Sequence, residues 1–328
     1  MKKAMTRGLI FGLFCALTAQ AANAQTYPDK PVTIIVPYGP GGITDIVART
    51  VGQELATSLG QPFIVLNRPG AGTTIGMREC ARAQPDGYTL CVTAPDSLSY
   101  APQLYANLGY DADKDFTAVA NLAWTSNVLV ARANAPFNTY NEMVAYAKSK
   151  PGTLNWGTWG EGTLPDVYLR WVRHVSGVEI TAVPYRGLAP NLTALQTGEI
   201  DITYLGVGTA LAQVQAGKVK PFVVVGTERS PLMPDQPTLK EVGGDPGLRS
   251  YFGVYAPANV PAVIVERLNK EFTKAMSSPK LEAFRKNYTL EPAGSSVTEF
   301  AAFLKQDQVN AAKVFKEMGF RPVAETKQ

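Results

Sequence analysis

The chain has 328 residues, a formal net charge of +4 and 18% charged residues, which are scattered along the sequence rather than gathered in blocks. This charge pattern gives no indication of a nucleic-acid partner. Beyond residue 24 no stretch is long and apolar enough to cross a membrane, and the remaining length is sufficient for two domains with hydrophobic cores.

The first residues have the features of a secretory signal. Three basic residues precede a short apolar stretch at 9–17, and Ala22-Asn23-Ala24 forms an A-x-A cleavage site. The apolar stretch is too short for a membrane-spanning helix. We therefore expect a periplasmic protein, exported by a signal peptide at residues 1–24 that is cleaved after Ala24.

The next elements alternate between strand and helix. The continuous apolar run Val32–Val36 predicts a strand covered on both faces. Apolar residues at every fourth position from Ile43 to Leu59 predict a helix that ends at Gly60. Between them lies a loop with three glycines, at positions 39, 41 and 42, whose backbone can approach a ligand closely.

The same alternation continues along the chain. Phe63–Asn67 predicts a second strand, the glycine-rich segment Gly70–Gly76 leads into a helix that reaches about residue 83, and Asp86–Ala94 predicts a turn and a third strand. Strands that alternate with helices indicate an α/β fold with a mostly parallel sheet.

The middle of the chain repeats this organisation. Asn127–Arg132 predicts a strand, and Thr139 with Glu142 has the spacing of a capping box at the start of a helix. A glycine-rich loop then precedes a helix that has Pro165 in its first turn and ends at Gly177. Three further strands follow, and the C-terminal part is helical. A proline-rich segment at 229–247 is the expected surface crossing between the two halves.

The glycine loops match no nucleotide-binding or hydrolase motif. Thr44 occupies the place of the third glycine of a dinucleotide fingerprint, and the second strand ends without a carboxylate. No P-loop and no nucleophile elbow is present, and the single histidine, His174, lies on a predicted helix. We therefore expect no cofactor and no metal, although two carboxylates that are distant in the sequence stay possible as a hydrolytic pair.

Two cysteines follow the signal peptide, Cys80 on a predicted helix and Cys91 on the next strand. In an exported protein they can form a disulfide, and they can equally be two buried thiols. The turn at 85–87 can bring them together, so both alternatives remain open.

Several motifs together resemble one family. The segments "YPDKPVTIIVPYGPGGITDIVAR", "LGQPFIVLNRPGAGTTIG", "PDGYTL" and "VPYRG" resemble, in this order, the Bug receptors, which are the periplasmic substrate-binding proteins of tripartite tricarboxylate transporters. The resemblance implies a two-lobed, flytrap-like α/β fold that closes over a small organic acid. Lobe 1 would comprise residues 25–122 and 248–328, and lobe 2 residues 123–247, with hinges near 122–127 and 247–254.

The resemblance also implies which residues bind the ligand. The loop from Tyr38 to Asp45 would hold one carboxylate largely through bridging waters, and Thr163 would donate its hydroxyl and N–H directly. For Asp45, an acid in a first helical turn, we favour a role at the helix dipole over ligand contact. The full set of candidate ligand-binding residues is Tyr38, Gly39, Gly41, Gly42, Thr44, Asp45, Thr93, Ser97, Thr158, Trp159, Glu161, Gly162, Thr163, Tyr185, Arg186, Tyr204, Leu205 and Gly206.

Departures from the family pattern bear on the ligand. Trp159 replaces a small or polar residue, and Leu205-Gly206 stands where relatives have an acid or amide that can pair with an ammonium group. Three tyrosines, at 38, 185 and 204, lie at strand ends that should face the same cleft, whereas Trp156 is expected in the core. These features favour an aromatic or bulky apolar carboxylate. Glu161 weakens this prediction, since it would repel a carboxylate unless it points to solvent or accepts from a hydroxyl or ammonium group.

We therefore expect a monomeric receptor without enzymatic activity that delivers an organic acid to the permease subunits of a tripartite transporter. Two alternatives remain at this point. The partner can instead be a sensor protein in a signalling system, and the same fold can carry a periplasmic enzyme, although no base–nucleophile pair is identifiable.

Overall fold

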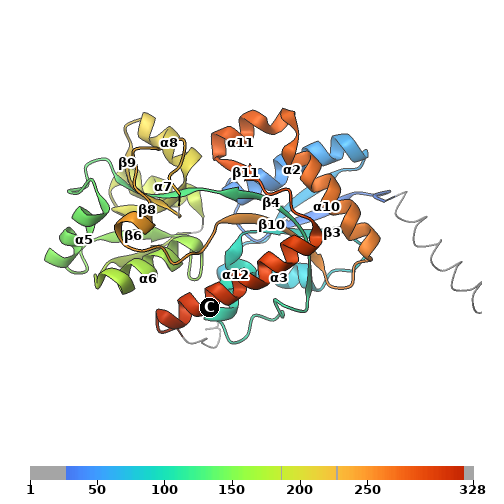
Figure 1. Cartoon of the computed structure of the whole chain (residues 1–328), viewed down its shortest axis with the longest axis horizontal. Helices are drawn as coiled ribbons and strands as arrows, with labels where there is room; N and C mark the ends of the chain where they lie inside the picture. Colours follow the sequence, from blue (N-terminus) through green and yellow to red (C-terminus); the bar gives the residue numbers. More distant parts are fainter. Residues whose placement is uncertain (1–26, 186, 227, 321–328) are drawn as a thin grey trace, which may run out of the picture.

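The computed structural model describes residues 27–185, 187–226 and 228–320, which form two mixed sheets, each flanked by helices (Figure 1). The predicted signal peptide and Arg186 lie outside the described residues. Among the helices described, none has the length and apolar character needed to span a membrane.

The first sheet has six strands in the order β11-β4-β10-β3-β1-β2. Strand β1 pairs in parallel with β2 and β3, whereas β10 is antiparallel to β3 and β4, and β11 is antiparallel to β4. The bounds of these strands are β1 Val32–Val36, β2 Phe63–Asn67, β3 Thr89–Thr93, β4 Phe116–Thr125, β10 Tyr251–Pro257 and β11 Leu290–Pro292.

The second sheet has five strands in the order β7-β6-β8-β5-β9. Strand β6 is parallel to β7 and β8, and β5 is antiparallel to β8 and β9. The bounds are β5 Asn127–Arg132, β6 Asn155–Thr158, β7 Thr181–Pro184, β8 Ile202–Gly206 and β9 Val219–Val225.

Helices cover both sheets (Figure 1). Those that accompany the first sheet are α2 Ile43–Leu59, η1 Ala71–Thr73, α3 Thr74–Ala81, η2 Asp96–Tyr100, α4 Ala101–Leu104, α10 Ala262–Ser277, η3 Pro279–Leu281, α11 Glu282–Tyr288 and α12 Val297–Glu317. Those that accompany the second sheet are α5 Tyr140–Ser149, α6 Leu164–Ser176, α7 Leu188–Thr197, α8 Val207–Gln215 and α9 Leu239–Val242.

The two-lobed α/β fold is confirmed, but the sheets are mixed rather than mostly parallel. The chain leaves the first sheet at the end of β4 and enters the second at β5, with only Ser126 between the two strands. It returns as β10, which inserts antiparallel between β3 and β4 and so breaks the parallel order. Strands of the first sheet therefore come from 32–125 and 251–292, and those of the second from 127–225. The exact lobe boundaries remain a prediction.

One core cluster joins the two sheets. It combines Tyr100 and Leu104, which follow β3, with Tyr168 and Tyr204 of the second sheet's layer and Phe315 of α12. Because all five side chains are buried, this cluster ties the two halves together through apolar packing. Trp156 belongs to the same cluster and is fully buried, as expected for a core aromatic residue.

The two cysteines are bonded. Cys80 on α3 and Cys91 on β3 form a disulfide with their Cα atoms 6.2 Å apart, within the range that such a bond requires. Both residues are fully buried. The structure thus selects one of the two alternatives that the sequence left open.

Candidate functional site

The loop between β1 and α2 is held by a carboxylate of its own helix. Gly41 has φ +81°, and its N–H donates to Asp45 Oδ2 at 2.9 Å. Asn67 at the end of β2 donates to Asp45 Oδ1 at 2.9 Å and to the Tyr38 carbonyl at 3.1 Å. Gly42 is the N-cap of α2. Asp45 therefore fixes the loop conformation, in keeping with a structural rather than a ligand-contacting role.

The loop between β6 and α6 has the same construction. Gly162 has φ +77°, and its N–H donates to Asp166 Oδ2 at 2.9 Å. The N-cap residues of the two helices have nearly the same backbone conformation, with φ −73° and ψ 161° at Gly42 and φ −74° and ψ 160° at Thr163. Each sheet thus presents one braced helix start after the carboxyl end of a parallel strand.

These helix starts are suited to an anion. In α2 the first hydrogen bond of the ladder runs from Ile46 N–H to the Gly42 carbonyl at 3.0 Å, and in α6 Asp166 and Val167 donate to the Thr163 carbonyl. In α2 the N–H groups of residues 43–45 precede this bond and have no partner inside the helix, whereas in α6 only Leu164 N–H does, because Pro165 has no N–H and Thr163 N–H donates to the Gly160 carbonyl. The helix dipole places partial positive charge on these groups. Carboxylates are the natural ligands of such groups.

The two halves touch at the edge of these loops. A Cβ added to Gly72 of η1 would lie 2.9 Å from the carbonyl oxygen of Glu161, and one added to Gly162 would lie 2.6 Å from Leu104 Cδ1. The Tyr105 hydroxyl donates to the same Glu161 carbonyl at 3.4 Å. The β6–α6 loop is therefore in direct contact with η1 and α4 from the first sheet's layer.

Buried hydroxyl groups lie behind the β1–α2 loop. The Tyr38 hydroxyl donates to Asp96 and is 3.1 Å from Thr93 Oγ1. Thr93 Oγ1 is 2.5 Å from Ser97 Oγ, which donates to Thr73 Oγ1 at 2.9 Å. Apart from Tyr38, these residues are almost fully buried: Asp96, Thr93, Ser97 and Thr73. The network connects the end of β3 to the loop and to η1, and the predicted residues Tyr38, Thr93 and Ser97 do lie together.

Two buried carboxylates, Asp96 in this network and Asp307 beside Ser99, predict that the free energy of unfolding depends on pH. Burial raises the pKa of Asp96 to about 7 and that of Asp307, which accepts from Ser99, to about 6, although hydrogen bonds to both carboxylates oppose the shifts. Between about pH 4 and 7 the folded state therefore keeps protons that the unfolded state releases, and the free energy of unfolding falls as the pH rises through this window.

We expect a higher melting temperature at pH 5.5 than at pH 8, and a smaller difference in Asp96→Asn, whose side chain cannot titrate. Melting curves of wild type and variant across this range check it. Asp113→Asn, which removes an exposed carboxylate, serves as the control and should keep the wild-type profile. An Asp96→Asn profile that is superimposable on wild type would contradict the assignment.

Three aromatic rings pack in a row next to the β6–α6 loop. Trp159 meets Tyr204 edge to face with ring centroids 6.1 Å apart, and Tyr204 stacks on Tyr168 at 5.4 Å. Trp159 and Tyr38 both pack against the core cluster that joins the two sheets. Trp159 is half-buried, and its indole Nε1 has no hydrogen-bond partner among the described residues. Of the predicted aromatic site residues, Trp159 and Tyr204 are thus in direct contact, and Tyr204 is fully buried.

Other predicted residues lie elsewhere. Leu205 packs in a separate cluster on the opposite face of the second sheet from Tyr204. The Tyr185 ring packs against that same cluster, and its hydroxyl donates to Glu199 at 2.8 Å. The exposed Glu161 carboxylate accepts from Arg170 at 3.0 Å. Leu205 thus lies in the core, Tyr185 packs against that core at the surface, and Glu161 forms an exposed ion pair with Arg170.

The remaining candidate residues lie in the loops and first helical turns after the strands. The Thr163 hydroxyl donates to the Gly160 carbonyl at 2.7 Å and so closes the loop in this structure. Thr158, at the end of β6, is buried, and its Oγ1 accepts from Gly160 N–H at 3.4 Å. Gly206 is the N-cap of α8. Gly39 and Thr44 belong to the β1–α2 loop and to the first turn of α2.

Sequence reasoning missed several residues of this region. Asp96 and Thr73 in the hydroxyl network and Tyr105 at the contact with Glu161 were not predicted. Nothing in the sequence indicated Thr73, since threonine rarely adopts positive φ, yet the structure gives it φ 80°. For Asp96 and Tyr105 only the tertiary structure supplies the partner.

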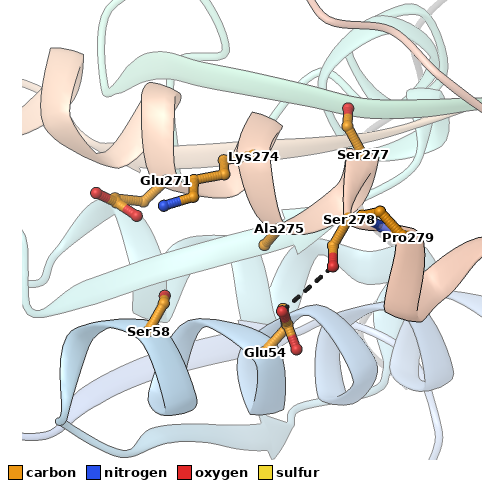
Figure 2. A pocket seen from close by; sticks show the side chains of 8 residues that line it. All are labelled: Glu54, Ser58, Glu271, Lys274, Ala275, Ser277, Ser278 and Pro279. Atoms are coloured by element: carbon orange, nitrogen blue, oxygen red, sulfur yellow. Dashed lines mark hydrogen bonds between the residues drawn. The ribbon is translucent and has the colours of Figure 1, made fainter.

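A surface hollow of about 330 Å³ lies between α2 and α10 and is a separate feature (Figure 2). Its lining includes Glu54, whose Oε1 accepts from Ser278 at 3.3 Å, together with Glu271 and Lys274. Glu54 is 12 residues into α2, about 16 Å along the helix axis from its first residue. The hollow is therefore remote from the braced helix starts.

Comparison with known proteins identifies relatives of the whole chain. Residues 47–320 match the model of the tripartite tricarboxylate transporter family receptor. A UPF0065 protein of Bordetella pertussis is 35% identical over 308 residues, 93% of this chain and 95% of the relative. The structure of the periplasmic binding protein BugD superposes with a TM-score of 0.84 at 30% identity, covering 90% of this chain and 100% of that one. Rpa4515 of R. palustris, solved with adipate, gives a TM-score of 0.85 at 30% identity, with the same coverage of both chains.

Proposed function

Because the chain belongs to the family of tripartite tricarboxylate transporter receptors, the Bug receptors, we propose that it holds a small organic acid between its β1–α2 and β6–α6 loops and delivers it to the membrane subunits of such a transporter. It is a solute-binding protein of a periplasmic receptor family. The observation that supports the ligand-binding proposal is the similarly braced helix start on each sheet, with the two halves in contact at Gly72 and Glu161.

The same geometry bears on the class of acid. An amino acid would need a carboxylate for its ammonium group, but the carboxylates near the loops are engaged: Asp45 and Asp166 brace the loops, Glu161 pairs with Arg170, and Asp96 accepts from Tyr38. The partly exposed rings of Tyr38 and Trp159 offer apolar contact, whereas Tyr204 is fully buried. We therefore propose a carboxylate with an apolar or aromatic skeleton, a class that includes the adipate found in a related structure.

A thermal-shift panel tests this function on the chain from Gln25 onward. The panel contains adipate, succinate, benzoate, phthalate and nicotinate, which have apolar or aromatic skeletons, on one side, and citrate and glutamate on the other. An acid at a hundred times its dissociation constant should stabilise the native state by about 2.7 kcal/mol. We expect the largest rise in melting temperature with adipate or a benzoate-type acid, and recovery of that acid chemically unchanged. A shift with glutamate or citrate alone would contradict the proposed class, and conversion of the acid would indicate an enzyme.

A further inference from the structure

A nine-residue pattern occurs twice, once in each half. Gly41–Arg49 and Gly162–Arg170 align without a gap, each with glycine first, aspartate fifth and arginine ninth. The contacts repeat as well: the glycine N–H donates to the aspartate at 2.9 Å in both, and the arginine Nε lies 2.9 Å from Asp45 Oδ1 and 2.8 Å from Asp166 Oδ2. The repetition concerns three positions, and the glycine and the aspartate alone form the hydrogen bond that holds the loop.

The aspartates create an electrostatic problem for the proposed ligand. Asp45 is 3% exposed and Asp166 is 4% exposed, and each lies in the first turn of the helix whose start would receive a carboxylate. Burial alone would raise the pKa of Asp45, but the hydrogen bonds from Arg49, Gly41 and Asn67 outweigh it and lower the pKa. Asp45 is thus a buried anion that repels an anionic ligand across a weakly screening interior. At Asp166 burial outweighs the opposing effects of Arg170 and Gly162 and raises the pKa, so Arg170 is the largest influence that favours the charged form there.

Each arginine lies beside one aspartate and can offset its charge, and each also makes a second hydrogen bond to another protein group. Arg49 also donates through Nη2 to Asn67 Oδ1 at 2.8 Å. Arg170 also donates to Glu161 at 3.0 Å and stacks over the Phe320 ring at 4.8 Å. In each arginine Nε and Nη2 are thus directed to protein partners, and the position beside the aspartate suits the guanidinium to compensating its charge.

We propose, resting on the function proposed above, that Arg49 and Arg170 are affinity-determining residues that act without touching the ligand: each neutralises the aspartate that holds a ligand-binding loop in place. The aspartate supplies the acceptor that fixes the left-handed glycine, and the arginine removes the penalty that its charge imposes on an incoming carboxylate. This predicts that the arginine is needed only while the aspartate is charged.

A charge-balance cycle on the first loop tests the proposal. Arg49→Gln, Asp45→Asn and the double variant are titrated with every acid of the panel by thermal shift and calorimetry. In Asp45→Asn the amide oxygen can still accept from Gly41 N–H, but the amide nitrogen then faces the Asn67 and Arg49 donors, so this variant can lose affinity on its own. The readout is therefore the effect of Arg49→Gln in each background. We expect Arg49→Gln to lower affinity about tenfold when introduced into wild type and less than about threefold when introduced into Asp45→Asn.

Arg229→Gln is the matched control, because it removes one arginine from an exposed ion pair with Glu241 and should leave affinity unchanged. Arg170→Gln with Asp166→Asn repeats the cycle on the second loop. An equal loss on adding Arg49→Gln to wild type and to Asp45→Asn, or no loss on adding it to wild type, would overturn the inference while the proposed function stands. If wild type binds none of the acids, the proposed function fails and this inference fails with it.

Discussion

Gly72→Ala is expected to lower the affinity for the organic acid about thirtyfold, roughly 2 kcal/mol, without unfolding the protein. Gly72 has φ +56°, and a Cβ there would lie 2.9 Å from the Glu161 carbonyl and 3.0 Å from the Tyr105 hydroxyl. Because the Glu161 carbonyl is a backbone group, it cannot move aside as a side chain can. The two halves of the molecule must therefore separate to accommodate the methyl group. A ligand held between the two loops binds the closed arrangement best, and a variant that disfavours closure therefore loses affinity.

Calorimetric titration of Gly72→Ala measures this effect, and Gly60→Ala is the matched control. Gly60 also has positive φ, +71°, but a Cβ there would meet no atom within 4 Å. Both variants carry a similar cost of alanine in a left-handed conformation. Only Gly72→Ala should lose affinity, whereas both should lose some stability. Equal affinities in the two variants would show that the Gly72–Glu161 contact plays no part in binding.

Loss of the Cys80–Cys91 disulfide is expected to lower the free energy of unfolding by about 2–3 kcal/mol. The bond closes a loop of 11 residues between α3 and β3, and its removal restores conformational freedom to the unfolded chain. Urea unfolding of the Cys80→Ala/Cys91→Ala variant measures the change.

Wild type unfolded with and without reductant is the control, because the reduced protein keeps both sulfur atoms in the buried site. We expect the reduced protein to lose most of what the double variant loses, with the remainder due to the missing sulfur volume. Thiol counting on the denatured, non-reduced protein should find neither cysteine free. Two reactive thiols would contradict the bond.

The regular elements with strong patterns could be predicted from the sequence. Helix α2 spans Ile43–Leu59, as the fourfold spacing of its apolar residues indicated, and Gly60 ends it in a left-handed conformation with φ 71°. Helix α6 likewise ends at Gly177, with φ 61°. Such boundaries follow from local chemistry, since only glycine adopts these angles at low cost.

Strands β4 and β10 were not predicted, and their partners explain why. They pair with each other over most of their lengths, although about 130 residues separate them in the sequence. Strand β4 contains three alanines and an asparagine, which are weak strand formers, and β10 contains a glycine. Their conformation is set by burial between neighbouring strands, which a local pattern does not reveal.

The candidate site could be predicted in part for a similar reason. The glycine loops could be predicted because they follow predicted strands and precede predicted helices, and Thr163 was proposed from the resemblance to the Bug receptors. Tyr204 and Leu205 could not both face the cleft, since consecutive residues of a strand point to opposite sides of the sheet, and the structure places them in different clusters. The roles of Asp166, Arg49 and Arg170 emerge only when the hydrogen bonds of the two loops are compared.

The most direct test of the proposed receptor function is a calorimetric titration of the chain from Gln25 onward with the acid that gives the largest thermal shift. Binding of one acid molecule per chain, with affinity reduced in Gly72→Ala and unchanged in Gly60→Ala, is the predicted result. Binding that is indifferent to Gly72→Ala, or a stoichiometry other than one, would contradict a ligand held between the two braced loops.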